Sequence, residues 1–331
     1  MKIRCGTFNL FQFAQPPYSF YIRKDRFSKE KWEEKTTWIK KQIQTMNCDV
    51  IGFQEVFTPK ALEEICFELG FKYFKTIEEA KVRFEHDTIF QSTTVAIASK
   101  YPISKLTSVK EDTNSLKKHN LNTKFKFQRK PIKATININN QEIVFYICHL
   151  KSNRLNEFEY LFKKNDTLEH KKVMVQKALK EDFSPALKQR LCEASSLYID
   201  IKNEKLPKIL MADLNDKEFS LTIDALTNKA YHETRKNSKY LLYDPFYLYD
   251  YKNPNPHPEA KEEKRVPTSY FQGNGNILDY IFISKEFNKN NKHALAYISS
   301  YEVLDEHLKQ TSNGSLLQSD HAQVVCELSF N

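Results

Sequence analysis

The stretch that decides how this sequence folds is KILMADLND, residues 208–216. Its apolar run from Ile209 to Ala212 predicts a buried strand. The run ends in Asp213 and Asn215, a carboxylate and a carboxamide two residues apart. Sheet proteins commonly place their chemistry at such strand ends, because a core strand holds the side chains rigidly. Taken alone, the stretch is explained more simply by an Asx turn that closes the strand. The functional interpretation therefore depends on whether other strands end in the same way.

Length and composition limit the fold class. The chain has 331 residues, of which 40% are hydrophobic and 13% aromatic, so it can bury a sizeable core. This length is compatible with one large sandwich or barrel, or with two domains. Glycine occurs only six times and no Walker or dinucleotide fingerprint is present, which argues against a Gly-rich phosphate loop.

Charge and cysteine content indicate the partner and the compartment. The formal net charge of +9 and the pI near 9.0 favour a polyanionic partner, either nucleic acid or an anionic membrane surface. The six cysteines are dispersed without C-x-x-C spacing, as expected for small buried hydrophobes rather than zinc ligands or a disulfide framework. The chain begins MKIRCGTFNL, without the pattern of a signal peptide, and no apolar run reaches the length of a membrane span. A cytoplasmic protein is therefore expected.

Several other predicted strands carry polar side chains at or near their ends. Most of these residues have a simpler explanation when taken singly, such as a strand cap, a solvated edge or a structural histidine. Asp279 differs, since it lies inside the apolar run ILDYIFIS, where a carboxylate must be paired because burying it free is costly. The residues are Asn9 after the strand Ile3–Leu10, Glu55 in CDVIGFQEV, His149 at the end of FYICHL, Asp279, and Asp320 and His321 before the closing strand AQVVCELSF.

Together these side chains supply the parts of a site that cleaves phosphoesters. Asn9, Glu55 and Asp320 offer hard oxygen ligands, and Asp213 is a carboxylate able to activate a nucleophile. A site rich in oxygen and free of cysteine suits Mg²⁺ or Mn²⁺ rather than zinc. A divalent ion beside a phosphate, with imidazole donors on the phosphate oxygens, is suited to phosphoester hydrolysis.

The order of the motifs along the chain, TFN, QE, HLKS, ADLN, LDYIF and SDH, resembles the endonuclease/exonuclease/phosphatase superfamily with its deoxyribonuclease-I-like fold. The resemblance runs from Asn9 to His321, and the HLKS tetrad is most similar to bacterial nuclease members. It implies an α/β (α+β) fold, a four-layer sandwich of two packed, mostly antiparallel β-sheets flanked by helices. A single catalytic domain over 1–331 is expected, with a basic helical insertion at about 154–182 and an irregular excursion at about 231–270.

The resemblance also implies a role for each matching residue. Asn9, Glu55 and Asp320 would hold the metal, Glu55 most directly. Asp213 would orient or deprotonate the attacking water, and Asn215 would position the phosphate. These roles share one requirement, which is that the side chains meet at one edge of the sandwich.

The histidines and the residues around them complete the implied site. His321 would hydrogen-bond a non-bridging phosphate oxygen or handle a proton, with Asp279 fixing the orientation of its ring. His149 matches the position where family nucleases place a His or Tyr beside the phosphate, where it would protonate the leaving oxygen. Lys151 and Asn153 follow at the same strand end and are the predicted substrate contacts.

One position departs from the family pattern. Some family nucleases carry an acidic residue two positions after the first-strand Asn, and Phe11 stands there instead, so an additional metal contact is not expected. The main site is unaffected. Because its neighbouring carboxylates need the metal to remain ionised together, activity is expected to require Mg²⁺ or Mn²⁺ and to fail in chelator.

The substrate is expected to be nucleic acid. Two basic segments, 104–133 and 154–180, offer a rim that tracks a phosphate backbone, although the first is explained equally well as a solvated strand face guarded against edge pairing. The chain is therefore predicted to be a metal-dependent phosphodiesterase, in the first place a nuclease acting on DNA or RNA. The alternatives are a lipid or inositol phosphate phosphodiesterase or phosphatase (sphingomyelinase-like or inositol-phosphatase-like), and a non-catalytic binding scaffold. All acidic and His positions are present, which disfavours the scaffold.

Overall fold

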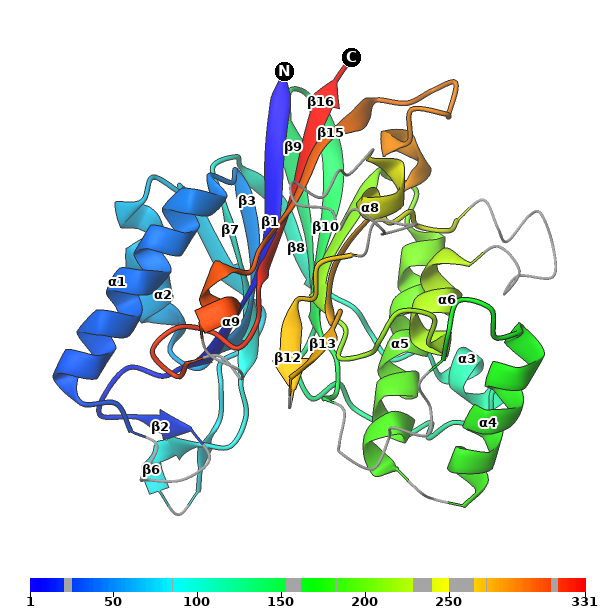
Figure 1. The fold of residues 1–331 in the computed structure, drawn as a ribbon, viewed down its shortest axis with the longest axis horizontal. Helices are drawn as coiled ribbons and strands as arrows, with labels where there is room; N and C mark the ends of the chain where they lie inside the picture. Colours follow the sequence, from blue (N-terminus) through cyan, green and yellow to red (C-terminus); the bar gives the residue numbers. More distant parts are fainter. Residues whose placement is uncertain are drawn as a thin grey trace.

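Two packed β-sheets form the centre of the molecule (Figure 1). The computed structural model describes residues 1–20, 26–84, 86–152, 162–181, 184–228, 240–249, 265–271, 273–310 and 315–331. The larger sheet has the strand order β15 (Ala296–Leu304), β16 (Gln323–Phe330), β1 (Lys2–Phe13), β3 (Val50–Val56), β7 (Thr94–Ser99), β4 (Tyr73–Thr76). The smaller has the order β14 (Asp279–Ile283), β11 (Lys208–Asp213), β10 (Gln141–His149), β9 (Ile132–Ile138), β8 (Ile103–Ser108).

Each sheet contains one parallel pair of strands, and the other pairs are antiparallel. In the larger sheet the parallel pair is β1 with β3, and in the smaller sheet it is β10 with β11. The mixed, mostly antiparallel character predicted from the sequence is therefore confirmed.

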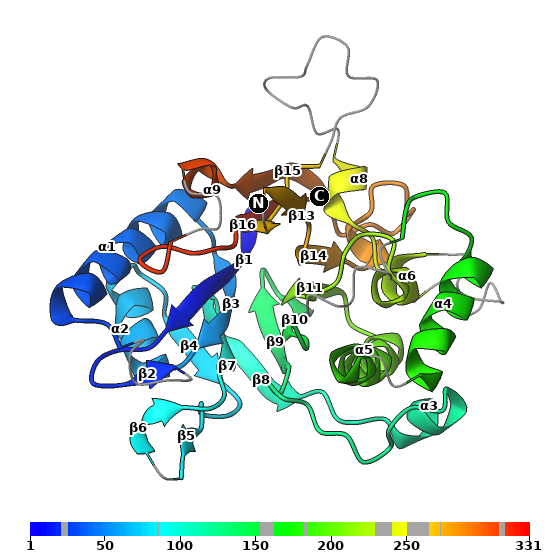
Figure 2. The same cartoon turned by 60° about the horizontal axis from the view of Figure 1, so that its bottom comes forward.

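Helices cover the outer face of both sheets, which gives four layers (Figure 2). On the larger sheet they are α1 (Lys29–Met46) and α2 (Pro59–Glu68), and beside the smaller sheet they are α3 (Thr113–Lys118), α4 (Leu168–Lys180), α5 (Pro185–Asn203) and α6 (Leu221–Thr227). Three buried apolar clusters fill the spaces between layers, and the one between the sheets includes Ile97, Ile147 and Met211. The predicted sandwich is thus the observed architecture.

Gly52 of β3 lies where the two sheets approach closely. A Cβ atom at this position would stand 2.7 Å from Ile147 Cδ1 and 3.3 Å from Met211 Cβ. Both partners belong to the smaller sheet, on β10 and β11. The absence of a side chain therefore sets the spacing between the sheets here.

Local side chains shape several of these elements. Asn139 and Asn140 make the hairpin turn between β9 and β10, with φ of 53° and 62°, the left-handed values that such turns require. In α1, Ser28 caps the first turn, its hydroxyl accepting a hydrogen bond from the backbone N–H of Lys31. Thr36 of the same helix is only half-buried, whereas Lys35 lies on the buried face.

Other expectations were wrong or fall partly outside the described residues. Within the basic segment 104–133, the explanation as a solvated strand face applies to β8, an edge strand of the smaller sheet, whereas residues 123–131 form a loop. Of the predicted basic insertion the structure describes residues 162–181, in which α4 begins at Leu168. Of the excursion, the described parts include α8 (Pro245–Leu248) and the start of β12 (Ser269–Phe271). Among the described residues, no helix combines the length and apolarity needed to cross a bilayer.

The smaller elements lie around these layers. They are β2 (Ser19–Phe20), β5 (Val82–Arg83), β6 (His86–Phe90), β13 (Asn274–Asn276), η4 (Lys285–Phe287) and α9 (Glu306–Gln310).

Candidate active site

The predicted site residues that the structure describes meet at the edge of the sandwich opposite the two chain termini (Figure 1). Strands β1, β3, β10 and β11 end at this edge, and β14 and β16 begin there, because they run antiparallel to β11 and β1. In the register, Asp213 pairs with His149 on one side and with Asp279 on the other. Asp279 is therefore the first residue of β14, and the expectation that it lies in the middle of that strand was wrong.

The Asp213 carboxylate is buried and held from three directions. Its Oδ2 accepts a hydrogen bond from Asn9 Nδ2 at 3.0 Å and lies 3.3 Å from His149 Nε2. Its Oδ1 accepts the backbone N–H of Asn215 at 2.9 Å. Burial first, and then the charge of Asp279, raise the pKa of Asp213 to about 7. A fixed carboxylate with this pKa is suited to accept a proton near neutral pH.

His321 and Asp279 form a buried pair next to Asp213. His321 Nδ1 lies 2.7 Å from Asp279 Oδ2, and backbone N–H of Asp279 donates to Thr268 Oγ1. Burial of the ring lowers the pKa of His321, but the carboxylates of Asp279 and Asp320 outweigh this effect and raise the pKa well above its ordinary value. The charge of these carboxylates favours the protonated imidazole, and the contact with Asp279 fixes the orientation of the ring through Nδ1.

Glu55 is held in place by an unusual backbone. Its own φ is +58°, and the facing residues Phe11 and Gln12 at the end of β1 have φ of 48° and 64°. The backbone N–H of Gln12 donates to Glu55 Oε2 at 2.9 Å. Left-handed conformations in non-glycine residues are costly and cluster at functional sites, so this local geometry supports a functional role for Glu55.

Two carboxylate oxygens at this edge fit a divalent cation. Oδ1 of Asp279 and Oδ1 of Asp320 are buried without a hydrogen-bond partner among the described residues. Burial raises the pKa of Asp320 to about 6, and the charge of Glu55 acts in the same direction. A divalent cation would satisfy an orphaned oxygen and relieve the repulsion between these carboxylates. A second group of side chains is also close enough together to share a metal ion. It consists of Asp213, Asp279 and His321, which each place one donor atom within 4.8 Å of the other two.

His149 is buried beside Asp213, in surroundings that disfavour a charge on its ring. Burial lowers its pKa well below the ordinary value, and the positive charges of Arg129, His321 and Lys151 add to this effect. Its Nδ1 has no partner among the described residues. Its Nε2 faces the Asp213 carboxylate, at 3.3 Å from Oδ2.

The remaining predicted residues are placed at the same edge or fall outside the described part. Asn215, with φ of 49°, donates from Nδ2 to the carbonyl of Leu150 at 3.1 Å. Lys151 is half-buried directly after β10. Asn153 lies outside the described residues.

Two charged residues that sequence reasoning missed hold the segment after β10. Arg129 Nη1 donates to the carbonyls of His149 and Leu150 at 3.3 and 3.1 Å. Glu193 of α5 accepts the backbone N–H of Lys151 on Oε2 at 2.7 Å. The HLKS segment is therefore fixed by side chains from two distant parts of the chain.

The sequence carries a weak signal for Glu193, and also for Lys35, the buried charge of α1. Glu193 precedes Leu197 by four positions, and Lys35 precedes Ile39 by four, so each is in register with the apolar face of its helix. A charge on the apolar face of a helix must be paired or solvated, so its position predicts a partner elsewhere in the chain.

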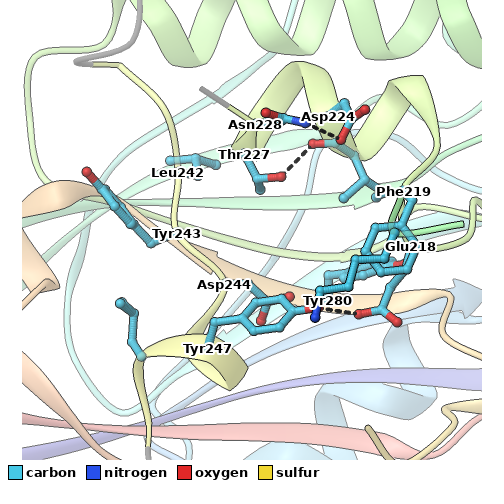
Figure 3. Close-up of a pocket in the computed structure, with 13 residues that line it drawn as sticks. Glu218, Phe219, Asp224, Thr227, Asn228, Leu242, Tyr243, Asp244, Tyr247 and Tyr280 are labelled. Carbon is cyan, nitrogen blue, oxygen red and sulfur yellow. Dashed lines mark hydrogen bonds between the residues drawn. The ribbon is translucent and has the colours of Figure 1, made fainter. Parts of the chain in front are cut away.

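A separate cavity of about 400 Å³ lies beside α6 and α8 (Figure 3). Its carboxylates already have partners. Glu218 accepts hydrogen bonds from the Tyr247 hydroxyl and from Arg265, and Asp224 pairs with Lys171 Nζ at 2.8 Å. The described residues that line the cavity differ from those of the Asp213 cluster, so the cavity is not part of the candidate site.

Comparison with known proteins extends over the whole chain. The model of the Endonuclease/Exonuclease/phosphatase family matches residues 6–321. The human Nocturnin catalytic domain with bound sulfate is similar in structure, with a TM-score of 0.59 and 16% identity over 100% of this chain and 95% of that chain. D. rerio TDP2 complexed with a single-strand DNA product has a TM-score of 0.55 and 11% identity, covering 99% of each chain. No curated protein matches the chain.

A third solved structure, a mannosyl-6-phosphatase of Bacteroides thetaiotaomicron, has a TM-score of 0.50 and 15% identity over 99% of this chain and 100% of that chain. At these identities each structure shows a shared fold. The family match adds evidence from the sequence, because the matched residues include every motif from the end of β1 to His321. This chain is a member of the endonuclease/exonuclease/phosphatase family of hydrolytic phosphoesterases.

Proposed function

We propose that this protein is a divalent-metal-dependent phosphodiesterase, specifically a nuclease that hydrolyses DNA or RNA by attack of water on phosphorus. The observation that carries the proposal is the buried Asp213 carboxylate, hydrogen-bonded by Asn9 and by the Asn215 backbone, next to the His321–Asp279 pair. A base of raised pKa is suited to accept a proton from the attacking water, and a fixed imidazolium beside it is suited to donate one to the phosphate or the leaving group. One catalytic domain over residues 1–331 is part of the proposal.

Asp213 is the proposed base. Its carboxylate takes the proton of the attacking water, and its pKa of about 7 places this step near neutral pH. Asn9 Nδ2 and the backbone N–H of Asn215 donate to this carboxylate and His149 lies beside it, which together keep it oriented.

His321 is the proposed donor to the phosphate. With Nδ1 engaged by Asp279, its Nε2–H is the proton-bearing position for a non-bridging oxygen or the leaving group. Asn215 is proposed to position the phosphate with the second N–H of its amide, since the first is held by Leu150.

Glu55 and Asp320, with the Asn9 amide oxygen, are the proposed residues that hold Mg²⁺ or Mn²⁺. When bound, the ion supplies Lewis-acid polarisation of the phosphoryl group. The orphaned Oδ1 of Asp320 supports this assignment.

A nucleic-acid substrate is supported by charge. The chain carries a formal +9, and Arg129 and Lys151 bring positive charge next to His149 at the site. Lys151 and Asn153 are the proposed substrate contacts. The solved structure of D. rerio TDP2 with a single-strand DNA product shows that this fold accommodates such a ligand in that protein.

Hydrolysis assays with the purified protein test the proposal. Duplex DNA, single-stranded DNA, RNA, sphingomyelin and inositol phosphates are offered with Mg²⁺ or Mn²⁺, with and without chelator. We expect metal-dependent cleavage of a nucleic acid that falls about 10²- to 10⁴-fold in Asp213→Asn, because the base is lost. Asp224→Asn, a buried carboxylate paired with Lys171 away from the site, is the matched control and should retain activity.

Turnover of sphingomyelin or inositol phosphate without cleavage of nucleic acid would move the assignment to those substrates. Inactivity on every substrate would overturn the catalytic proposal and leave the fold.

A further inference from the structure

Lys35 of α1 is buried, with 0% of its surface exposed, and lies beside the candidate metal site. Its Nζ donates to three backbone carbonyls, those of Phe11, Leu316 and Gln318, each at 2.9 Å. Three acceptors match the three N–H groups of an ammonium ion, whereas a neutral amine has only two to give. The side chain is therefore satisfied as a cation, although burial lowers its pKa to about 7.

The three carbonyls belong to two segments that carry site residues. Phe11 lies two residues after Asn9, at the irregular end of β1. Gln318 lies two residues before Asp320, on the approach to β16. A second link joins the same segments, because Ser319 Oγ donates to the carbonyl of Asn9 at 2.7 Å.

The charge of Lys35 also acts on the site. The negative charges of the Glu55 and Asp320 carboxylates both favour its protonated form. A fixed cation behind two carboxylates offsets their mutual repulsion before any metal binds. The helix thus contributes both geometry and charge to this half of the site.

We propose that Lys35 is a positioning residue, which holds the end of β1 and the segment 315–321 at the spacing that assembles the metal-binding side of the site. The metal-binding part of this inference rests on the proposed function, whereas the tethering of the two segments does not.

Hydrogen exchange measures the tether directly. Lys35→Met keeps the length and apolar stem of the side chain but removes its charge and its three donors. We expect faster amide exchange in residues 10–13 and 315–321, with other strands unchanged. Lys171→Met is the matched control, because Lys171 is also buried on a helix and paired with a carboxylate, Asp224, away from the site. It should leave these two segments protected.

Metal binding measures the consequence. Titration of the metal-free protein with Mn²⁺ by calorimetry should give a dissociation constant about 10- to 100-fold higher in Lys35→Met than in wild type. In hydrolysis, kcat at a fixed Mn²⁺ concentration should fall while KM for the substrate changes little, and excess Mn²⁺ should restore part of kcat. Lys171→Met should match wild type in both measurements. If Lys35→Met does not fold, Lys35→Gln, which keeps two donors, carries the same test.

The outcomes separate the two claims. Unchanged exchange and Mn²⁺ affinity, or a general loosening equal in the Lys35 and Lys171 variants, would overturn the proposal. Faster exchange confined to the two segments in a protein whose wild type binds no Mn²⁺ would support the tether and overturn the metal site.

Discussion

Among the carboxylates that favour a charged His321 imidazole, Asp279 has the largest effect. Asp279 Oδ2 lies 2.7 Å from Nδ1, and this carboxylate holds the pKa of His321 well above its ordinary value. If the protonated ring donates to the substrate, activity falls as pH rises through that pKa. The Asp279 charge therefore protects activity on the alkaline side.

Asp279→Asn tests this relation. The amide oxygen still accepts a hydrogen bond from Nδ1, but its charge is gone, so the pKa of His321 falls toward its ordinary value. We expect the alkaline limb of kcat/KM to move to lower pH, with activity on the alkaline side reduced by about 10²-fold. A pH profile of kcat/KM measures the shift, and Asp224→Asn should leave the profile in place. An alkaline limb that does not move would show that His321 is not the group titrating there.

At the scale of elements, the spacing of the two sheets depends on Gly52. The strands β3, β10 and β11 meet at this residue, and they also deliver Glu55, His149 and Asp213 to the site edge. A side chain at position 52 would push against the same strands that set the site geometry.

Gly52→Ala should lower the free energy of unfolding by about 1–3 kcal/mol, because its Cβ would overlap Ile147 Cδ1. Ile147→Val removes that atom and alone should cost about 0.5–1.5 kcal/mol. In the double variant the two losses should be less than additive, since the overlap is relieved. Denaturant unfolding of all four proteins measures the cycle. Strict additivity would show that the Cβ is accommodated elsewhere.

At the scale of the whole molecule, the positive charge that matters for binding a polyanion is the part that lies near the candidate site. The formal charge of +9 is spread over the chain, and at the site edge Arg129 and Lys151 place positive charge near His149. A polyanion approaching this edge releases counterions, so its affinity depends on salt.

The salt dependence of duplex or single-stranded DNA binding measures this contribution. With Asp213→Asn as an inactive background, log Kd against log salt should be linear, and Lys151→Met should reduce the slope by about 1. Lys2→Met is the control, because Lys2 begins β1 at the opposite edge and pairs with Glu327 at 2.7 Å. Equal slopes in the Lys151 and Lys2 variants would place the DNA elsewhere.

The sequence by itself determined the apolar strands and the polar residues at their ends. Short buried runs such as Ile209–Ala212 are local signals, and the order of the six motifs identified the family. The candidate residues Asn9, Asp213, Asp279 and His321 were accordingly found without coordinates, and the structure brings them to one edge.

Only the tertiary structure decided which residues meet and which charges are buried. Strand register places Asp279 opposite Asp213, and register depends on pairing between segments far apart in the chain. Lys35 and Glu193 are in register with the apolar faces of their helices, but their partners include backbone groups in distant segments. Backbone groups carry no sequence identity, so the sequence does not indicate which segment such a charge contacts, and the contact appears only when the chain is folded.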